Sequence, residues 1–219
     1  MHREDLRTNN SNQLEFLAMP KLSAQSRARK IKLLLFDVDG VLTDGKLFFL
    51  PDRQATSADS SLTAKGSIEF KGFHAHDGVA NSLARIGGLR TGLITRRFSE
   101  TVALRARDLK LEFVNQGSQD KGSAFLAIVK EAGLTPDQAA FMGDDVVDLP
   151  AMRLAGFSIA VKNARAEVKK EAHYITPNAG GEGALRDAVD FILKSQGKLK
   201  KVIDAYIGEH KSDPAVRGN

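Results

Sequence analysis

Two aspartates, Asp37 and Asp39, stand two residues apart directly after the short apolar run 31–36. In extended backbone, residues two apart point to the same side, so both carboxylates would face one site. Gly40 follows them and allows a sharp turn beside a ligand. An Asp-x-Asp pair alone is also common at solvated strand ends, but the apolar strand before it makes it more specific. The pair therefore indicates a site at the end of this strand.

A second acidic group consists of Asp144, Asp145 and Asp148, which follow the apolar run 139–142 and open a predicted helix. Three carboxylates are costly to gather without a cation, and Mg²⁺ prefers oxygen ligands from carboxylates, water and phosphate. Helix N-capping is the simpler explanation for one or two of these aspartates. It does not explain a matching acidic pair at another strand end. The two groups together therefore indicate a site for a hard cation.

Thr95 and Lys121 could complete a site for phosphate. Thr95 ends the apolar run 89–94, and Lys121 lies near the start of the helix predicted after the run 111–114. A positive charge and a helix N-terminus both favour phosphate. Each residue alone has an ordinary explanation, as a structural hydroxyl or a solvated lysine. Together with the two acidic groups that flank them in the chain, they fit a phosphate site.

Short apolar runs alternate with helical patterns along most of the chain, and these elements must position the residues above. The predicted strands are 31–36, 89–94, 111–114, 139–142, 157–161 and 173–175, and the predicted helices are about 98–109, 120–131, 146–154 and 182–195, with a continuation of the last helix to 207 left open. This alternation predicts an α/β fold with a doubly wound, Rossmann-like parallel sheet. Ligands of such sheets bind beyond the carboxyl ends of the strands, where Asp37, Thr95 and Asp144 fall.

One segment, about 46–73, interrupts the alternation and predicts an antiparallel β-hairpin. The polar stretch 51–66 at its centre predicts a flexible loop. The second strand is expected to place His74 and His76 on one face, but two histidines without a third ligand do not predict a metal site. The chain has room for this hairpin insertion between the chemical residues, but for no large cap domain.

The charge distribution argues against a nucleic-acid-binding protein. The formal net charge is +5, but residues 1–30 and 197–219 contribute all of it, and residues 31–196 carry 21 positive and 21 negative side chains. The folded part therefore has no excess of basic residues with which to bind nucleic acid.

We expect a flexible N-terminal tail over 1–30, one domain over 31–197 and a C-terminal tail over 198–219, with Met19 as an alternative start to Met1. The sequence contains no cysteine, which excludes disulfides and thiolate metal sites. No apolar run reaches the ~18 residues that suggest a membrane span. The N-terminus lacks the apolar stretch of a secretory signal. We therefore expect no membrane partner and a cytoplasmic location.

In order and spacing, these residues resemble the haloacid dehalogenase superfamily of phosphohydrolases. The resemblance covers about 31–197, and its four motifs correspond to 37–41, Thr95, Lys121 and 143–148. It implies a HAD-like fold and an aspartyl-phosphate intermediate. By this resemblance, Asp37 is the nucleophile, Asp39 is the general acid and then the base, and Thr95 and Lys121 neutralise the phosphate. Mg²⁺ would be held by Asp37, the backbone carbonyl of Asp39, and Asp144. Asp145 would support the acidic group, and Asp148 would orient Lys121 or its loop.

Within that superfamily the chain is most similar to the cap-less sugar-acid phosphatases, in particular the 3-deoxy-D-manno-octulosonate 8-phosphate phosphatase family. The segments that carry this similarity are 37–45, the hairpin, 73–78, 180–186 and 196–199. The resemblance implies hydrolysis of a small phosphorylated sugar acid in the synthesis of the inner lipopolysaccharide sugar. It also implies a homotetramer in which a ring of hairpins covers the sites and the C-terminal tail reaches a neighbouring subunit.

Three positions depart from the pattern of that family. Arg96 stands where Gly is common, and His76 and Glu182 stand where Arg is usual. Relatives that act on nine-carbon sugar-acid phosphates can carry Glu at the last position, so a nine-carbon 9-phosphate is the alternative substrate. The residues offered for substrate binding are Arg96, His76, Asp77, Gly181 and Arg186. Arg96 is equally compatible with a solvent-facing side chain.

Two further hypotheses remain open. The first is a phosphatase of different specificity, for a nucleotide or phosphoserine, although such enzymes usually carry a cap domain. The second is a non-catalytic binding protein built on the same fold. A retired enzyme is expected to have lost a catalytic aspartate, whereas Asp37, Asp39 and Asp144 are all present.

Overall fold

The structure is a computed structural model that describes residues 22–51 and 67–211. The expectations for the first 21 residues, for Met19 as a start and for nearly all of the loop 51–66 concern positions outside these ranges. No helix in the described part of the chain is long and apolar enough to cross a membrane.

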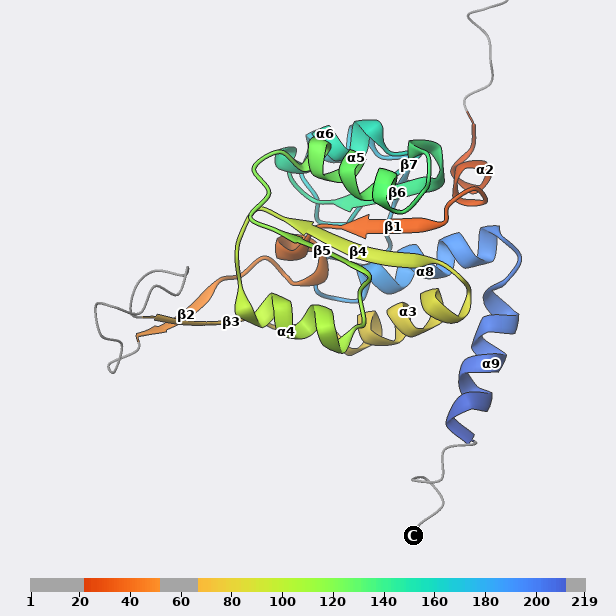
Figure 1. Ribbon diagram of the computed structural model, residues 1–219, viewed down its shortest axis with the longest axis horizontal. Coiled ribbons are helices and arrows are strands. Elements are labelled where there is room, and N and C mark those ends of the chain that lie inside the picture. Colours follow the sequence, from red (N-terminus) through yellow and green to blue (C-terminus); the bar gives the residue numbers. More distant parts are fainter. Residues whose placement is uncertain (1–21, 52–66, 212–219) are drawn as a thin grey trace, which may run out of the picture.

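A six-stranded parallel sheet forms the centre of the molecule, which confirms the predicted doubly wound α/β fold (Figure 1). Its strand order is β5-β4-β1-β6-β7-β8. The strands are β1 (Leu33–Phe36), β4 (Arg90–Thr95), β5 (Phe113–Gln116), β6 (Ala139–Gly143), β7 (Phe157–Ala160) and β8 (Tyr174–Ile175). The central strand β1 is fully buried, as expected for a strand covered on both faces.

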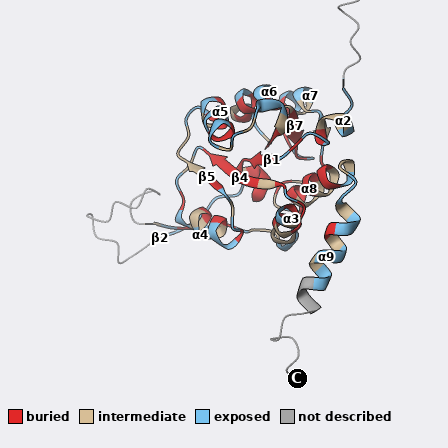
Figure 2. Cartoon of the chain, turned by 45° about the vertical axis from the view of Figure 1, so that its right-hand side comes forward, coloured by how far each residue is buried: buried red, intermediate tan, exposed pale blue. Residues whose placement is uncertain are grey.

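Helices cover both faces of the sheet (Figure 1). One layer contains α5 (Lys121–Glu131), α6 (Leu149–Leu154) and α7 (Ala166–Glu171), and the other contains α3 (Ala75–Ile86), α4 (Glu100–Asp108) and α8 (Ala184–Ser195). Short turns η1 (Val38–Leu42), η2 (Pro136–Gln138) and η3 (Val146–Asp148) complete the connections. Figure 2 shows that the buried residues concentrate in the sheet and on the inward sides of these helices.

Two helices form in segments expected to be tails. Helix α2 (Ala24–Ala28) places Ala28 in the core, and α9 (Leu199–Lys211) packs on α3 and buries Val202. The side-chain amide of Gln196 donates a hydrogen bond through Nε2 to the carbonyl of Ile31 at 2.7 Å. The ordered part of the chain therefore extends beyond the predicted limits of 31 and 197, because both flanking helices carry apolar residues that the core accepts.

The sequence analysis missed α3 and extended the preceding strand too far. His74 is the N-cap of this helix, where its side chain accepts a hydrogen bond from the backbone N–H of His76, and His76 lies in the first turn. The expected strand face shared by these histidines is therefore wrong. The buried positions Ala80, Leu83 and Ala84 have helical spacing, a signal that could have revealed α3.

The predicted hairpin is confirmed, with strands β2 (Phe48–Pro51) and β3 (Ser67–Phe70) paired antiparallel. It projects from the body of the molecule (Figure 1). Its burial pattern is inverted: Glu69 and the following Lys71 are buried, whereas Ile68 and Phe70 are about half exposed. The charged side of the hairpin thus faces the body, and its apolar side faces solvent in the single chain.

Candidate active site

The carboxyl ends of three neighbouring strands bring the predicted chemical residues together. In the register of the sheet, Phe36 of β1 pairs with Leu93 of β4 and with Met142 of β6. The next residues along these strands therefore reach the same edge, where Asp37 and Thr95 are buried and Asp144 is partly buried. Local sequence patterns predicted each strand, and the parallel pairing of the strands brings their carboxyl ends together in one site.

Lys121 links this edge to the first turn of α5. Its ammonium lies 2.8 Å from Asp37 Oδ1 and donates a hydrogen bond to Asp148 Oδ1 at 2.6 Å. All three side chains are at most 8% exposed. Burial lowers the pKa of Lys121, but the charges of Asp37 and Asp148 raise it further, so the lysine is held as a cation. Buried charges of this kind are tolerated only when they are paired.

Asp148 organises the second acidic loop as well as Lys121. Its Oδ2 accepts hydrogen bonds from the backbone N–H groups of Asp144 at 2.9 Å and Asp145 at 3.3 Å. Both oxygens of Asp148 are thus occupied, which fits a residue that orients the lysine and the loop. Asp145 is exposed, and its carboxylate caps the N–H of Val146 at 2.7 Å.

The carboxylates of Asp37, Asp144 and Asp148 fit a cation site, since an oxygen of each lies within 4.8 Å of the others. Asp37 Oδ1 faces the Lys121 ammonium at 2.8 Å, whereas Asp144 Oδ1 is buried without a hydrogen-bond donor. Burial, followed by the charge of Asp148, raises the pKa of both Asp37 and Asp144 to about 7. A hard cation would supply the missing partner for Asp144 Oδ1 and favour the ionised forms of both carboxylates.

Two glycines allow the loops around this site to approach closely. Gly40 adopts φ +93°, and a Cβ at this position would collide with the carboxylate of Asp144. A Cβ at Gly180 would collide with the carbonyl oxygen of Gly40. The loop before α8 therefore lies directly on the turn that carries Asp39, so the two loops form one wall of the site.

Comparisons with known proteins match this geometry. A model of the haloacid dehalogenase-like hydrolase family matches residues 89–186. A 3-deoxy-D-manno-octulosonate 8-phosphate phosphatase from Haemophilus influenzae is 34% identical over 188 residues, which cover 86% of this chain and 96% of the relative.

This chain belongs to the 3-deoxy-D-manno-octulosonate 8-phosphate phosphatase family. It is a phosphatase of the haloacid dehalogenase superfamily, as the sequence motifs indicated. A solved member from Moraxella catarrhalis, in complex with magnesium, phosphate and KDO, is 33% identical, with a TM-score of 0.74 and coverage of 84% of this chain and 97% of that one. A probable YrbI family phosphatase from Pseudomonas syringae is 38% identical, with the same TM-score and coverage.

Of the residues offered for substrate binding, Arg96 and His76 are exposed, and Gly181 is partly buried. Arg96 donates a hydrogen bond to the side chain of Gln119 at 3.0 Å. The rings of His74 and His76 lie 4.6 Å apart, and a Cβ at Gly183 would lie within 3.7 Å of both. The loop before α8 and the start of α3 are therefore neighbours.

Asp77 and Arg186, also offered for substrate binding, make contacts between α3 and α8. Asp77 is fully buried, and its Oδ1 accepts a hydrogen bond from the backbone N–H of Arg186 at 3.1 Å, in the first turn of α8. Burial raises the pKa of Asp77 to about 6. The Arg186 side chain pairs with Asp190 at 2.8 Å. These contacts fix α3 against α8.

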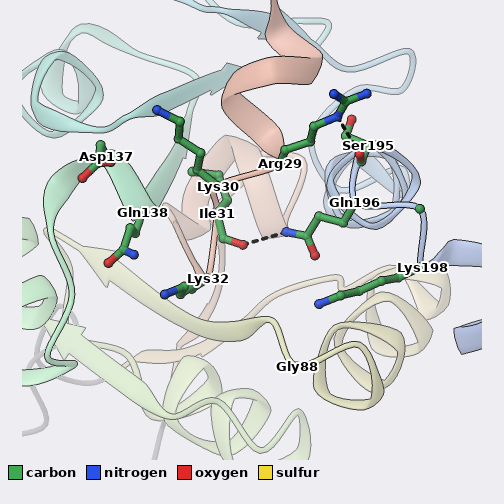
Figure 3. A pocket seen from close by; sticks show the side chains of 11 residues that line it. Arg29, Lys30, Ile31, Lys32, Gly88, Asp137, Gln138, Ser195, Gln196 and Lys198 are labelled. Carbon is green, nitrogen blue, oxygen red and sulfur yellow. Dashed lines mark hydrogen bonds between the residues drawn. The ribbon is translucent and has the colours of Figure 1, made fainter.

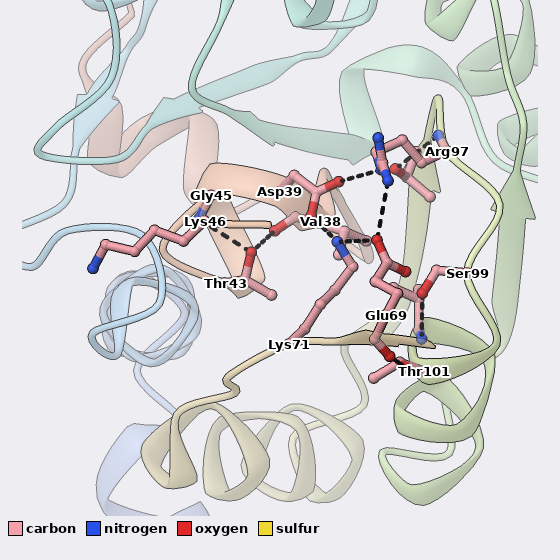
Figure 4. Close-up of polar contacts among 12 residues, drawn as sticks. Val38, Asp39, Thr43, Gly45, Lys46, Glu69, Lys71, Arg97, Ser99 and Thr101 are labelled. Atoms are coloured by element: carbon pink, nitrogen blue, oxygen red, sulfur yellow. Dashed lines mark hydrogen bonds and ion pairs between the residues drawn. The ribbon is translucent and has the colours of Figure 1, made fainter. Parts of the chain in front are cut away.

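Three charged residues that sequence reasoning missed surround Asp39 (Figure 4). Lys71 donates to Asp39 Oδ1 at 2.5 Å, and Arg97 Nε lies 3.7 Å from Asp39 Oδ2. Glu69 Oε1 lies 3.3 Å from Lys71 and 3.0 Å from Arg97. The available signal was the alternation in β3, where two charged residues share one face of an otherwise apolar strand.

Proposed function

We propose that this chain is a magnesium-dependent phosphomonoesterase that releases phosphate from 3-deoxy-D-manno-octulosonate 8-phosphate, in synthesis of the inner lipopolysaccharide sugar. The observation that carries the proposal is the buried Asp37, which lies 2.8 Å from the Lys121 ammonium and beside Asp144, whose Oδ1 is buried without a hydrogen-bond donor. The named activity of the Haemophilus and Moraxella relatives supports the choice of substrate.

In the first step, a carboxylate oxygen of Asp37 attacks phosphorus and forms an aspartyl-phosphate. The bond between phosphorus and the sugar oxygen breaks, its electron pair goes to that oxygen, and the Asp39 carboxyl donates a proton to it. Lys121 and the Thr95 hydroxyl lie at the same strand edge and neutralise or bind the transferring oxygens. Asp148 keeps Lys121 in place through its 2.6 Å hydrogen bond.

In the second step, Asp39 takes a proton from water as that water attacks the aspartyl-phosphate. The bond between Asp37 and phosphorus breaks, which restores the Asp37 carboxylate and releases inorganic phosphate. Mg²⁺, held by Asp37, the backbone carbonyl of Asp39, and Asp144, would neutralise phosphate charge and let an anionic nucleophile approach it. Asp144 Oδ1, which is buried without a hydrogen-bond donor, supplies a place for this ion.

We further propose a homotetramer, because the hairpin presents apolar side chains to solvent in the single chain. Phe48, Leu50, Ile68 and Phe70 are 42%, 56%, 55% and 45% exposed. Phe48 and Phe70 stack with ring centroids 5.1 Å apart. Exposed apolar clusters of this kind mark interaction surfaces. Light scattering should give a tetramer, and Phe48→Ser with Phe70→Ser a smaller species; a monomeric natural protein would contradict the proposal.

The catalytic domain is proposed to centre on 31–197, and the reaction is proposed to take place in the cytoplasm. Truncation after Lys211 and before Leu22 should leave the rate of phosphate release unchanged. Fractionation of cells should recover the activity with cytoplasmic enzymes. A loss of activity on truncation, or recovery in another fraction, would contradict these assignments.

Phosphate release from a panel of substrates tests the proposed function. The panel contains the octulosonate 8-phosphate, two nonulosonate 9-phosphates, hexose 6-phosphates and a nucleotide, each with Mg²⁺ and with chelator. We expect preference for the octulosonate and loss of activity with chelator. Preference for a nine-carbon acid would identify His76, Arg96 and Glu182 as specificity residues. No release from any substrate, or equal release by Asp37→Asn, would contradict the proposal.

A further inference from the structure

The side chain of Asp39 is held from two sides. Lys71 donates to its Oδ1 at 2.5 Å, and the Arg97 guanidinium lies 3.7 Å from its Oδ2. Lys71 comes from the end of the hairpin, and Arg97 from the loop after β4. Two contacts on different oxygens fix both the position and the plane of a carboxylate. A single contact would leave the carboxylate free to rotate about the contacted oxygen.

Glu69 in turn fixes the two cations. Its Oε1 lies 3.3 Å from Lys71 Nζ and 3.0 Å from Arg97 Nη2, which gives a closed square of alternating charge (Figure 4). The backbone carbonyl of Glu69 accepts a hydrogen bond from Thr101 at the start of α4 at 3.1 Å. The hairpin is thereby attached to the body at the point where it reaches Asp39.

Stability alone does not account for this square of charges. The side chains of Lys71 and Glu69 are 0% and 4% exposed. Burying charges costs several kcal/mol each, and well-packed apolar residues in place of a buried ion pair are often neutral or stabilising. The opposite side of the same strand exposes apolar side chains. The hairpin thus buries its charges beside Asp39 and leaves its apolar residues outside.

We propose that Lys71 is a positioning residue for Asp39, oriented by Glu69 and assisted by Arg97. The inference rests on the proposed function, in which Asp39 donates a proton to the leaving oxygen. Asp39 sits on a turn, and its side chain is 21% exposed, so solvent would admit other rotamers without the two cations. Arg97 lies beyond hydrogen-bond distance of Oδ2, so this oxygen can carry the proton while Lys71 holds Oδ1, and the carboxyl is placed as general acid catalysis requires.

The nature of the leaving group separates this role from a structural one. A sugar alkoxide leaves poorly without a proton, whereas p-nitrophenolate leaves readily without one. The ratio kcat/KM includes only the steps up to release of the leaving group, so it excludes the later hydrolysis of the aspartyl-phosphate. A defect confined to proton donation therefore lowers kcat/KM for the sugar phosphate and spares it for the aryl phosphate.

The experiment compares Lys71→Met with the natural protein on its best sugar phosphate and on p-nitrophenyl phosphate, both with saturating Mg²⁺. We expect kcat/KM to fall about 10²-fold for the sugar phosphate and less than about threefold for the aryl phosphate. Lys46→Met is the matched control: its side chain is 71% exposed and pairs with the exposed Asp44. This control should change neither value.

Two more variants make the result decisive. Arg97→Met replaces a side chain that is 39% exposed, so it should fold even if Lys71→Met does not, and it should show the same selectivity at about tenfold. Asp39→Asn should show the largest selective loss. Suppose that Asp39→Asn lowers kcat/KM for the sugar phosphate alone, but that Lys71→Met and Arg97→Met lower it equally for both substrates or only raise KM. The positioning role is then wrong, and the proposed function stands. If Asp39→Asn is not selective, the acid assignment and this inference both fall.

Discussion

The two ends of the central sheet hold charged residues in opposite ways. At the carboxyl end, Asp37, Lys121 and Asp148 are buried and within ion-pair distance of one another. At the amino end, a cavity of about 780 Å³ lies between the starts of the strands and the end of α8. Its lining carries four basic side chains and a single acidic one, Arg29, Lys30, Lys32, Lys198 and Asp137, all exposed (Figure 3).

The polar contacts at the amino end serve the backbone. Arg29 donates to the carbonyl of Ser195 at 3.2 Å, and Lys198 donates to the carbonyl of Gly87 at 3.0 Å. These bonds satisfy carbonyls at the ends of helices, which otherwise lack partners. The comparison teaches that an excess of one charge does not by itself mark a site. Burial, mutual contact and an oxygen left without a donor distinguish the acidic end.

The largest test of this comparison is Lys121→Met. This change removes the cation shared by two buried carboxylates, so we expect the free energy of unfolding to fall by about 3–5 kcal/mol. Loss of a positive charge beside the transferring phosphate should lower kcat/KM by about 10³-fold. Chemical denaturation and phosphate release measure the two effects. A variant as stable as the natural protein would show that Asp37 and Asp148 do not depend on Lys121.

Magnesium gives the next largest effect. At a concentration 100 times its dissociation constant, a ligand that binds only the folded state stabilises it by about 2.7 kcal/mol. We expect Mg²⁺ to raise Tm and chelator to reverse the rise. Asp144→Asn should abolish this response yet raise Tm without metal, because burial and neighbouring acids disfavour the Asp144 charge. Asp137→Asn, at the opposite end, should keep the response. A full response in Asp144→Asn would remove that residue from the metal site.

The comparison also shows what the sequence could and could not predict. Asp37, Thr95 and Asp144 each follow an apolar run, and parallel pairing brings strand ends together, so the acidic end followed from local pattern. The square around Asp39 did not, because Lys71 arrives on a hairpin and Arg97 on a separate loop. The contact of Lys71 and Arg97 with Asp39 depends on how the hairpin folds back onto the body. Hydrophobic periodicity and secondary-structure propensity do not encode that arrangement. Helix α3 was missed since its first turn was taken for strand.

Asp77 sharpens the comparison, since it is buried like Asp148 but has one oxygen, Oδ2, without a hydrogen-bond partner. Burial raises its pKa from 3.8 to about 6 in the folded state. Between these values the folded protein holds a proton that the unfolded chain releases. Stability therefore falls as pH rises from about 4 to about 6, and this contribution is constant above that range.

Asp77→Asn should remove this fall, because an amide oxygen can still accept the hydrogen bond from Arg186 N–H and carries no charge. Relative to the natural protein, the variant should gain about 1–3 kcal/mol between pH 4 and pH 7. Urea denaturation across that range measures the difference. Asp204→Asn is the control, because this residue is 61% exposed and pairs with Lys200 on the surface. A difference curve that does not change with pH would show that Asp77 is ionised in the folded protein.

The smallest effect belongs to the basic end. Lys32 is exposed directly before β1 and lines the cavity at the amino end of the sheet, opposite the end that holds Asp37. Lys32→Met should change the free energy of unfolding by no more than about 0.5 kcal/mol, as is usual for surface positions. It should leave kcat/KM unchanged, in contrast to the same substitution at Lys121. If Lys32→Met lowered kcat/KM as well, charge at the amino end would act on the reaction across the sheet. Burial and mutual pairing of the charges would then not distinguish the active site from the basic end of the sheet.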